Sequence, residues 1–161
     1  MLRYIYLALK TAAKTHVDYR ALAEFRYEVR RFQNLSEQAA RAAGIEPQQY
    51  QALLAIKGLP ASSSATVGLL AERLQIQHHS AVELVDRLEA HGLLKRARSR
   101  KDRRQVLLRL TSSGEEILRQ VALPHRADLR SSGLTLLRAL QTVMAHSGPR
   151  ITGRNRTKYR E

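Results

Sequence analysis

Two helical patterns separated by a tight break constrain the fold of this chain more than any other feature. They lie in VGLLAERLQIQHHSAVELVDRLEAHGLLKR, residues 67–96. The break, QIQHHS, offers Ile76 as a buried turn residue and Ser80 or Gln77 as an N-cap. Two helices joined at a steep angle by such a turn form a helix-turn-helix, which we predict here. The apolar positions at helical spacing are Leu70, Ala71 and Leu74 in the first helix and Val82, Val85 and Leu88 in the second.

A β-hairpin is predicted directly after the second helix. Gly92 is expected to end that helix, and Leu93 and Leu94 begin a strand. The stretch QVLLRLT supplies the returning strand, whose residues Val106, Leu108 and Leu110 alternate with period two and are expected to face one side. Between the strands lies KRARSRKDRR, residues 95–104, which holds seven basic side chains and one carboxylate. A helix-turn-helix followed by a hairpin is a winged helix, so the basic stretch is predicted to be the wing and to approach a phosphate backbone.

Two further helices are predicted to form a dimer. Residues 18–43 carry an apolar stripe, which Gly44 is well placed to end, and residues 133–146 form an amphipathic last helix with Met144. An ordinary core-facing stripe is the alternative interpretation. The residues expected at the dimer interface are Leu22, Phe25, Val29, Phe32, Leu134, Leu137 and Leu140.

The remaining segments carry simpler signals. Residues 46–57 are predicted to form a helix with Pro47 in its first turn, and GLPASSSATV reads as a loop leading into a very short strand. Ser112 and Glu115 have the spacing of a capping box at the start of another helix. Pro124 is expected to kink or break that helix, and residues 148–161 are expected to be disordered.

Composition points to a polyanionic partner. The 161 residues carry a net charge of +14, and Arg outnumbers Lys, which favours bidentate phosphate and base contacts. A generically basic or ribosome-associated protein is the alternative at this level. The absence of cysteine excludes disulfides and thiolate metal sites. No apolar stretch is long enough for a membrane span, so we expect a soluble, cytoplasmic protein without membrane contact or cofactor.

Candidate DNA contacts fall in two places. The start of the second helix presents Gln77, His78, His79 and Ser80, whose side chains suit base edges, although some of them could merely cap the helix. The wing presents Arg98, Arg100, Lys101, Arg103 and Arg104, which suit phosphates or a narrow minor groove. His79 and Glu83 have a spacing that a metal could use, but a third ligand is lacking. No catalytic constellation is present, so an enzyme is not expected.

The same region resembles a known family. VDRLEAHGLLKR, followed by KDRRQVLLRLTSSG with its Asp-x-Arg wing, is similar to the multiple-antibiotic-resistance-regulator (MarR) family of bacterial winged-helix transcription factors, over roughly residues 46–120. The resemblance implies a homodimer with interlocked first and last helices and a helix from Gln77 in the major groove. It places Arg104 in the minor groove, with Asp102 orienting the wing arginines. Gln75 stands where the family commonly has Gly, so a slightly strained turn is expected.

The expected fold class is therefore mainly α, a winged helix-turn-helix with a β-hairpin wing, flanked by N- and C-terminal dimerisation helices. The expected segments are 1–45 for dimerisation, 46–112 for DNA binding, 113–147 for dimerisation and 148–161 as a basic tail. The expected partner is double-stranded DNA with a pseudo-palindromic operator, bound by a repressor. A sequence-indifferent architectural or RNA-associated protein, and a sensor that has lost DNA binding, remain the alternatives. In the family a small aromatic effector often binds beside the dimerisation helices, for which Tyr19, Tyr27 and Tyr50 are candidate lining residues, although buried core tyrosines are the favoured interpretation.

Overall fold

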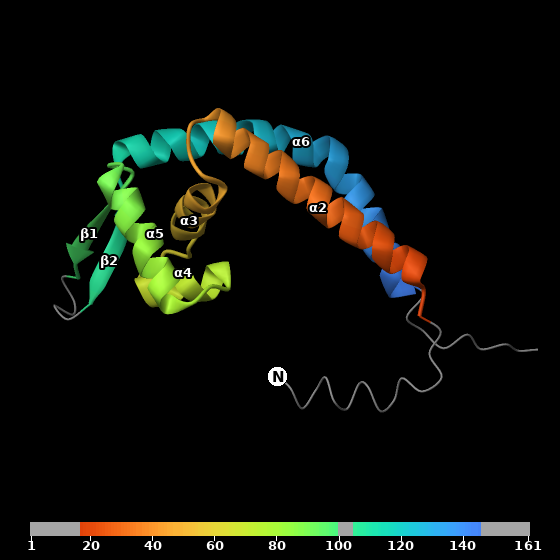
Figure 1. Cartoon of the computed structure of the whole chain (residues 1–161), viewed down its shortest axis with the longest axis horizontal. Helices are drawn as coiled ribbons and strands as arrows, with labels where there is room; N and C mark the ends of the chain where they lie inside the picture. Colours follow the sequence, from red (N-terminus) through yellow and green to blue (C-terminus); the bar gives the residue numbers. More distant parts are fainter. Residues whose placement is uncertain (1–16, 100–104, 146–161) are drawn as a thin grey trace, which may run out of the picture. The chain divides into compact units, whose positions relative to one another are not determined.

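The fold is mainly helical with one two-stranded hairpin, as the sequence predicts. The computed structural model describes residues 17–99 and 105–145. In chain order the elements are α2 (Tyr19–Ala42), α3 (Pro47–Lys57), α4 (Val67–Leu74), α5 (His78–Ala90), β1 (Leu94–Arg98), β2 (Val106–Leu110) and α6 (Ser112–Ala145) (Figure 1). None of the helices in the described ranges is both long and apolar enough to cross a membrane.

The chain divides into two compact units, and the two longest helices contribute to both. One unit is residues 31–133 and the other combines residues 1–30 with 134–161, of which 17–30 and 134–145 are described. The larger unit holds α3, α4, α5 and the hairpin, which lie together in Figure 1. The predicted helix over 18–43 and the predicted helix-turn-helix are therefore present as α2 and as α4 with α5.

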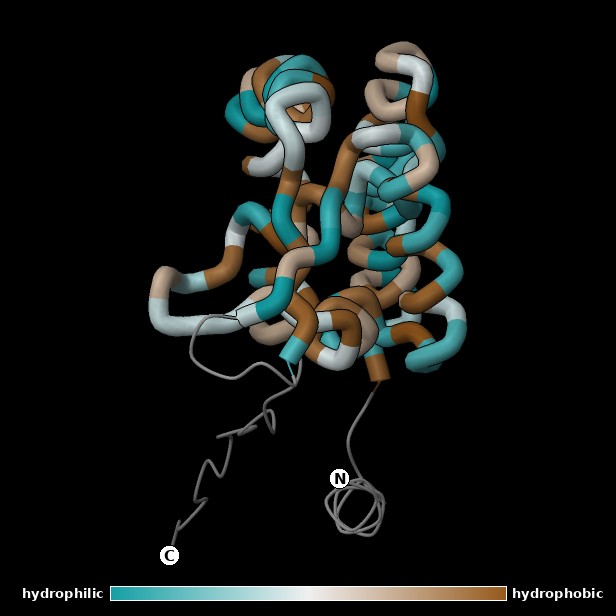
Figure 2. The backbone as a smooth tube through the Cα atoms, turned by 90° about the vertical axis from the view of Figure 1, so that its left-hand side faces the viewer, coloured by the Kyte–Doolittle hydropathy of each residue, from teal (hydrophilic) through white to brown (hydrophobic). Residues whose placement is uncertain are grey.

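The core of the larger unit is built from one side of each short helix. Along the tube of Figure 2, apolar and polar residues alternate within the helices, as amphipathic helices require. Leu70 and Ala71, two of the predicted apolar positions of the first helix, are buried on α4. The largest side chains that are almost fully buried are Tyr50, Leu53, Leu84, Leu88, Leu94, Val85 and Val121.

Local signals explain where two of the helices begin and end. Pro47 opens α3 at a position where its missing N–H costs nothing, and the Glu46 N–H donates to Gln49 Oε1 at 3.1 Å. α5 ends before Gly92, whose φ of 68° lies in the left-handed region that glycine adopts without strain. The Leu93 N–H then donates to the Leu88 carbonyl at 2.9 Å, which closes the helix in a Schellman arrangement.

Two local predictions are wrong. The segment before α4 contains no strand: Ala65 only accepts one backbone hydrogen bond, from the Leu108 N–H at 2.8 Å, and a single bond does not form a ladder. The N-cap of α6 is Thr111, and Ser112 is the first helical residue. Thr111 Oγ1 accepts from the Gly114 N–H at 3.1 Å and donates to the Gly92 carbonyl at 2.6 Å, so the threonine caps the helix and ties it to the hairpin.

Glycine is required where α6 meets the start of the hairpin. A Cβ on Gly114 would lie 2.0 Å from the Leu93 carbonyl oxygen, far inside van der Waals contact. The Thr111 N–H also donates to the Leu93 carbonyl at 3.1 Å. This close approach, together with the Thr111 bonds, fixes the first turn of α6 against the residue that precedes β1.

Pro124 does not break the last helix, contrary to one of the two predicted outcomes. α6 runs from Ser112 to Ala145 with Pro124 inside it, so the predicted separate helix over 133–146 is the second part of one element. The missing N–H leaves the Gln120 carbonyl without its helical donor. Both Gln120 and Pro124 are exposed, so water can satisfy that carbonyl, which explains why the helix continues.

One buried hydroxyl in α2 is left without a partner. Ser36 is only 2% exposed, and its Oγ accepts and donates no hydrogen bond within residues 17–99 and 105–145. A buried unsatisfied hydroxyl destabilises a fold by about 1–3 kcal/mol. Ser36 therefore marks a position where the core of this unit is not optimised for stability.

Candidate nucleic-acid interface

The turn between α4 and α5 is built around a residue in the left-handed conformation. Gln75 has φ 55° and ψ 40°, and among the described residues it is the one non-glycine with positive φ. Its N–H donates to the Glu72 carbonyl at 3.2 Å, its side-chain Nε2 donates to the same carbonyl at 2.7 Å, and the Ile76 N–H donates to Ala71 at 3.0 Å. The strained turn expected from Gln75 is thus present, and these bonds hold it so that α5 leaves α4 at a fixed angle.

The first turn of α5 presents polar groups to solvent. Gln77 is the N-cap residue, as one of the two predicted options had it, but its side chain makes no cap hydrogen bond. Ser80 lies inside the helix and is half-buried, so it is not the cap. His78 and His79 are exposed beside Gln77. The free N–H groups of a helix start attract anions, and the three exposed side chains carry donors and acceptors suited to base edges.

The hairpin is antiparallel and starts directly after α5. Leu94 pairs with Leu110 and Arg98 with Val106, and the Ser99 N–H extends the ladder by donating to the Gln105 carbonyl at 2.9 Å. Arg98 is exposed at the outer end of β1. The predicted contacts Arg100, Lys101, Asp102, Arg103 and Arg104 lie outside the described residues.

The predicted apolar face of β2 is packed only toward one end. Val106, Leu108 and Leu110 face one side, as predicted, but Leu108 is buried and Leu110 half-buried, whereas Val106 is 42% exposed. Val106 pairs with Arg98 at the end of the ladder that lies farthest from α6. The Arg98–Val106 pair is therefore exposed to solvent, although Ser99 next to it is buried.

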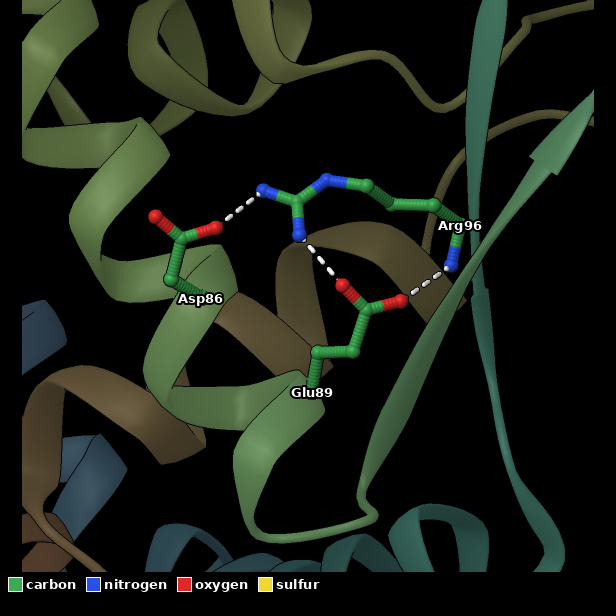
Figure 3. A network of polar contacts seen from close by, with 3 residues as sticks. All are labelled: Asp86, Glu89 and Arg96. Atoms are coloured by element: carbon green, nitrogen blue, oxygen red, sulfur yellow. Dashed lines mark hydrogen bonds and ion pairs between the residues drawn. The ribbon is translucent and has the colours of Figure 1, made fainter.

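A charged cluster joins α5 to β1 and was missed by sequence reasoning. The Arg96 guanidinium donates to Asp86 Oδ1 at 2.5 Å and to the Glu89 carboxylate, and the Arg96 N–H donates to Glu89 Oε1 at 3.0 Å (Figure 3). The backbone hydrogen bond from Arg96, followed by its side-chain hydrogen bond, holds the pKa of Glu89 below its ordinary value. The available sequence signal was the spacing: two carboxylates three residues apart on a helix, and one arginine on the strand face that also carries Leu94.

A second contact fixes the C-terminal end of α5. Gln49 is buried and accepts from the Glu46 N–H through Oε1, which leaves Nε2 to donate to His91 Nδ1 at 3.0 Å. His91 is the C-cap residue of α5. α5 is thereby held to α3 at its C-terminal end and to β1 along its side.

The predicted dimerisation residues lie on α2 and α6 with much of their apolar surface open. Phe25, Val29 and Phe32 are half-buried. The exposed ones are Leu22, Leu134, Leu137 and Leu140, joined by Met144. Within residues 17–99 and 105–145, part of this stripe is therefore left uncovered.

A groove of about 470 Å³ lies within the larger unit, between α2, α3 and the turn that follows α4. Phe32, Leu74, Ile76 and Leu84 supply apolar lining, and Arg73 supplies a positive charge. Of the tyrosines considered for an effector site, Tyr50 is buried in the core, as the favoured interpretation had it, while Tyr19 and Tyr27 are exposed.

The idea of a metal at His79 and Glu83 gains no support. Within the described ranges no three or more side chains of the metal-binding types come together. His79 and Glu83 lie four residues apart, and both are exposed on α5.

Comparison with known proteins places these elements in a family context. The sequence profile of the MarR family matches residues 43–105, the stretch that contains α3, the helix-turn-helix and β1. A comparison with curated protein sequences gives no match.

Solved structures share the fold. AbsC, a MarR family transcriptional regulator from Streptomyces coelicolor, is 23% identical with a TM-score of 0.63, covering 82% of this chain and 95% of its own. The transcriptional regulator Tm0710 from Thermotoga maritima is 28% identical with a TM-score of 0.52, covering 74% and 90%. A mutant MarR from E. coli complexed with operator DNA is 20% identical with a TM-score of 0.57, covering 77% and 90%.

Proposed function

From the match of residues 43–105 to the MarR family, we propose that this chain is a transcriptional regulator of that family and not an enzyme, and that it binds double-stranded DNA in a sequence-specific manner. One observation carries the proposal: the exposed, uncapped start of α5 lies in the same compact unit as a basic hairpin. Gln77, His78 and His79 read bases, and Arg98 contacts the backbone or the minor groove. The wing tip, Arg100, Lys101, Arg103 and Arg104, adds further phosphate or minor-groove contacts, with Asp102 orienting the arginines.

The protein acts as a homodimer. Leu134 and Leu137 are 55% and 49% exposed on α6, and Leu22 and Tyr27 are exposed on α2. A patch of large apolar side chains on the first and last helices is the kind of surface that a second copy covers. Two-fold symmetry also suits a palindromic operator, which presents the same half-site twice.

The dimer is tested by Leu137→Glu. Because Leu137 is half exposed in one chain, a charge there costs the folded monomer little, but it is buried without a partner in the dimer. Thr135→Glu is the matched control, since Thr135 is exposed on a different side of α6. We expect light scattering to report a dimer for the parent and for Thr135→Glu, and a monomer for Leu137→Glu. A parent protein that is monomeric at micromolar concentration would contradict the proposal.

We further propose a repressor that acts in the cytoplasm and releases DNA when a small aromatic acid enters the groove beside Arg73. The apolar lining suits a ring and Arg73 suits a carboxylate. Leu74 and Ile76 flank the Gln75 turn, so a ligand in the groove would change the angle at which α5 leaves α4. Benzoate should raise the Tm of the parent but not of Arg73→Ala, with cyclohexanecarboxylate as the aliphatic control. An equal rise in both proteins would remove the groove from the account.

DNA recognition itself is tested by selection from a random duplex pool with the full chain. We expect one enriched motif, bound more tightly than a shuffled duplex of the same composition at the same salt concentration. His79→Ala and Gln77→Ala should each lose about 1–3 kcal/mol on the selected duplex and little on the shuffled one. Gln120→Ala, which changes an exposed glutamine on α6, should match the parent. Equal affinity for both duplexes would favour a sequence-indifferent basic protein.

A further inference from the structure

The path of β1 sets which of its side chains can reach α5. Leu94 is buried, and alternation along a strand puts Arg96 and Arg98 on the same side as Leu94. Arg96 contacts residues that precede it by seven and by ten positions, so β1 runs back alongside the helix it follows. Arg98 is therefore the next residue on this side, one step nearer the wing tip.

Arg96 is the outermost side chain of β1 that is bonded to α5. It pairs with Leu108, the buried residue of β2 nearest the wing tip, whereas the next pair, Arg98 and Val106, is exposed. A two-stranded hairpin has little stability of its own in water. The direction of the segment beyond Leu108 therefore depends on what holds Arg96.

The cluster also changes the charge that α5 presents to DNA. Asp86 and Glu89 are 59% and 40% exposed, and unpaired carboxylates there would repel phosphates. The Arg96 side chain is 29% exposed and lies between them, with one nitrogen bonded to each. A planar guanidinium can serve two carboxylates at once in a fixed geometry, which a lysine cannot.

We infer that Arg96 is a positioning residue for DNA recognition. It fixes β1, the first strand of the wing, to α5 through Asp86 and Glu89, so that strand and helix approach DNA as one rigid surface. This inference rests on the proposed function. Arg96 need not contact DNA itself in this arrangement. Asp86 and Glu89 serve to hold Arg96 in place and do not merely make the surface soluble.

The first experiment compares two arginine deletions that change the net charge equally. Arg96→Ala removes the clamp, and Arg109→Ala removes an arginine that is exposed and lies on the opposite side of the hairpin, paired with Lys95. Binding of the full chain is measured on the selected and the shuffled duplex at one salt concentration. We expect Arg96→Ala to bind the selected duplex about tenfold more weakly than Arg109→Ala does, with equal binding of both variants to the shuffled duplex. Arg96→Lys should recover only part of the loss.

Removing the two carboxylates should change the affinity for the two duplexes in opposite directions. Asp86→Ala with Glu89→Ala makes the protein more positive, so binding to the shuffled duplex should tighten, while binding to the selected duplex should weaken because the wing is no longer held. If binding to both duplexes tightens, the carboxylates are only repulsive and the inference is overturned.

The last experiment separates positioning from stability. In the parent, Arg98→Ala should weaken binding to the selected duplex; in the Arg96→Ala background the same change should cost about half as much or less on the logarithmic scale, because an unheld wing no longer places Arg98. An unchanged cost, measured where urea titrations show both proteins folded, would make Arg96 merely structural. A parent that does not distinguish the two duplexes would overturn the proposed function and this inference with it. If the parent distinguishes the two duplexes but Arg96→Ala binds the selected duplex as tightly as Arg109→Ala does, the inference alone is overturned.

Discussion

Replacing Gly114 by alanine should destabilise the protein by about 2–4 kcal/mol, although alanine is the better helix former. The new Cβ would lie 2.0 Å from the Leu93 carbonyl oxygen, and real Cβ atoms essentially never come within 3.0 Å of a neighbour, so the first turn of α6 must move by about 1 Å. That shift stretches the bond from the Thr111 N–H to Leu93, now 3.1 Å, and disturbs the bond from Thr111 Oγ1 to Gly92, now 2.6 Å. Two weakened hydrogen bonds cost about 1–3 kcal/mol and forced repacking about 1–3 kcal/mol, against a helix-propensity gain of at most about 1 kcal/mol.

The assay is urea unfolding or a thermal scan of the full chain beside a second glycine variant. Gly133 also lies inside α6, but a Cβ there meets its nearest neighbour, a Leu129 methyl, at an ordinary 3.7 Å. Gly133→Ala should therefore stabilise the protein by up to about 1 kcal/mol. Gly114→Ala should lower the Tm by about 5–15 °C in a chain of this length. A Gly114→Ala protein as stable as Gly133→Ala, or more stable than it, would show that α6 does not pack against the Leu93 carbonyl as described.

Three other changes test separate parts of the structure. Ser36→Ala should raise the free energy of unfolding by about 1 kcal/mol, because it removes a buried hydroxyl without a partner; a loss of stability in urea titrations would mean that the hydroxyl is satisfied. At Gln75 we expect the stability order Gly, then Gln, then Ala, since glycine removes the left-handed strain while alanine keeps it and loses the 2.7 Å bond to Glu72; a more stable alanine variant would contradict the turn geometry. Because the folded-state pKa of Glu89 is depressed, its contribution to stability is present above the unfolded-state pKa and is lost as the pH falls through the folded value. The stability difference between the parent and Glu89→Gln should therefore be constant from neutral pH to about pH 5 and shrink as the pH falls below about 4; a difference that stays constant down to about pH 3 would contradict it.

The sequence was most informative where local rules act alone. The apolar spacing around Leu70 and Leu88 predicted two helices, and the glycine at 92 predicted the end of the second. The strained turn at Gln75 was expected from the family resemblance instead, since the family commonly has Gly there. These features depend on residues within one or two turns of each other, which periodicity and backbone preference describe well.

It was less informative where a distant contact decides. Thr111 replaces Ser112 as the N-cap because it also reaches the Gly92 carbonyl, nineteen residues away in the chain. The helix continues through Pro124 because the freed carbonyl of Gln120 can be solvated, which no local propensity specifies. The Arg96 cluster needs the strand to run back along α5, so neither the composition of the wing nor the helix pattern could reveal it.

Hydroxyl-radical footprinting on the selected duplex tests most directly whether this chain is a dimeric, sequence-specific DNA-binding protein. The account predicts two protected half-sites related by two-fold symmetry, with their centres about 10 base pairs or a multiple of that apart, and no footprint on the shuffled duplex at the same protein and salt concentration. Protection that spreads evenly along both duplexes, without a symmetric pattern, would contradict it.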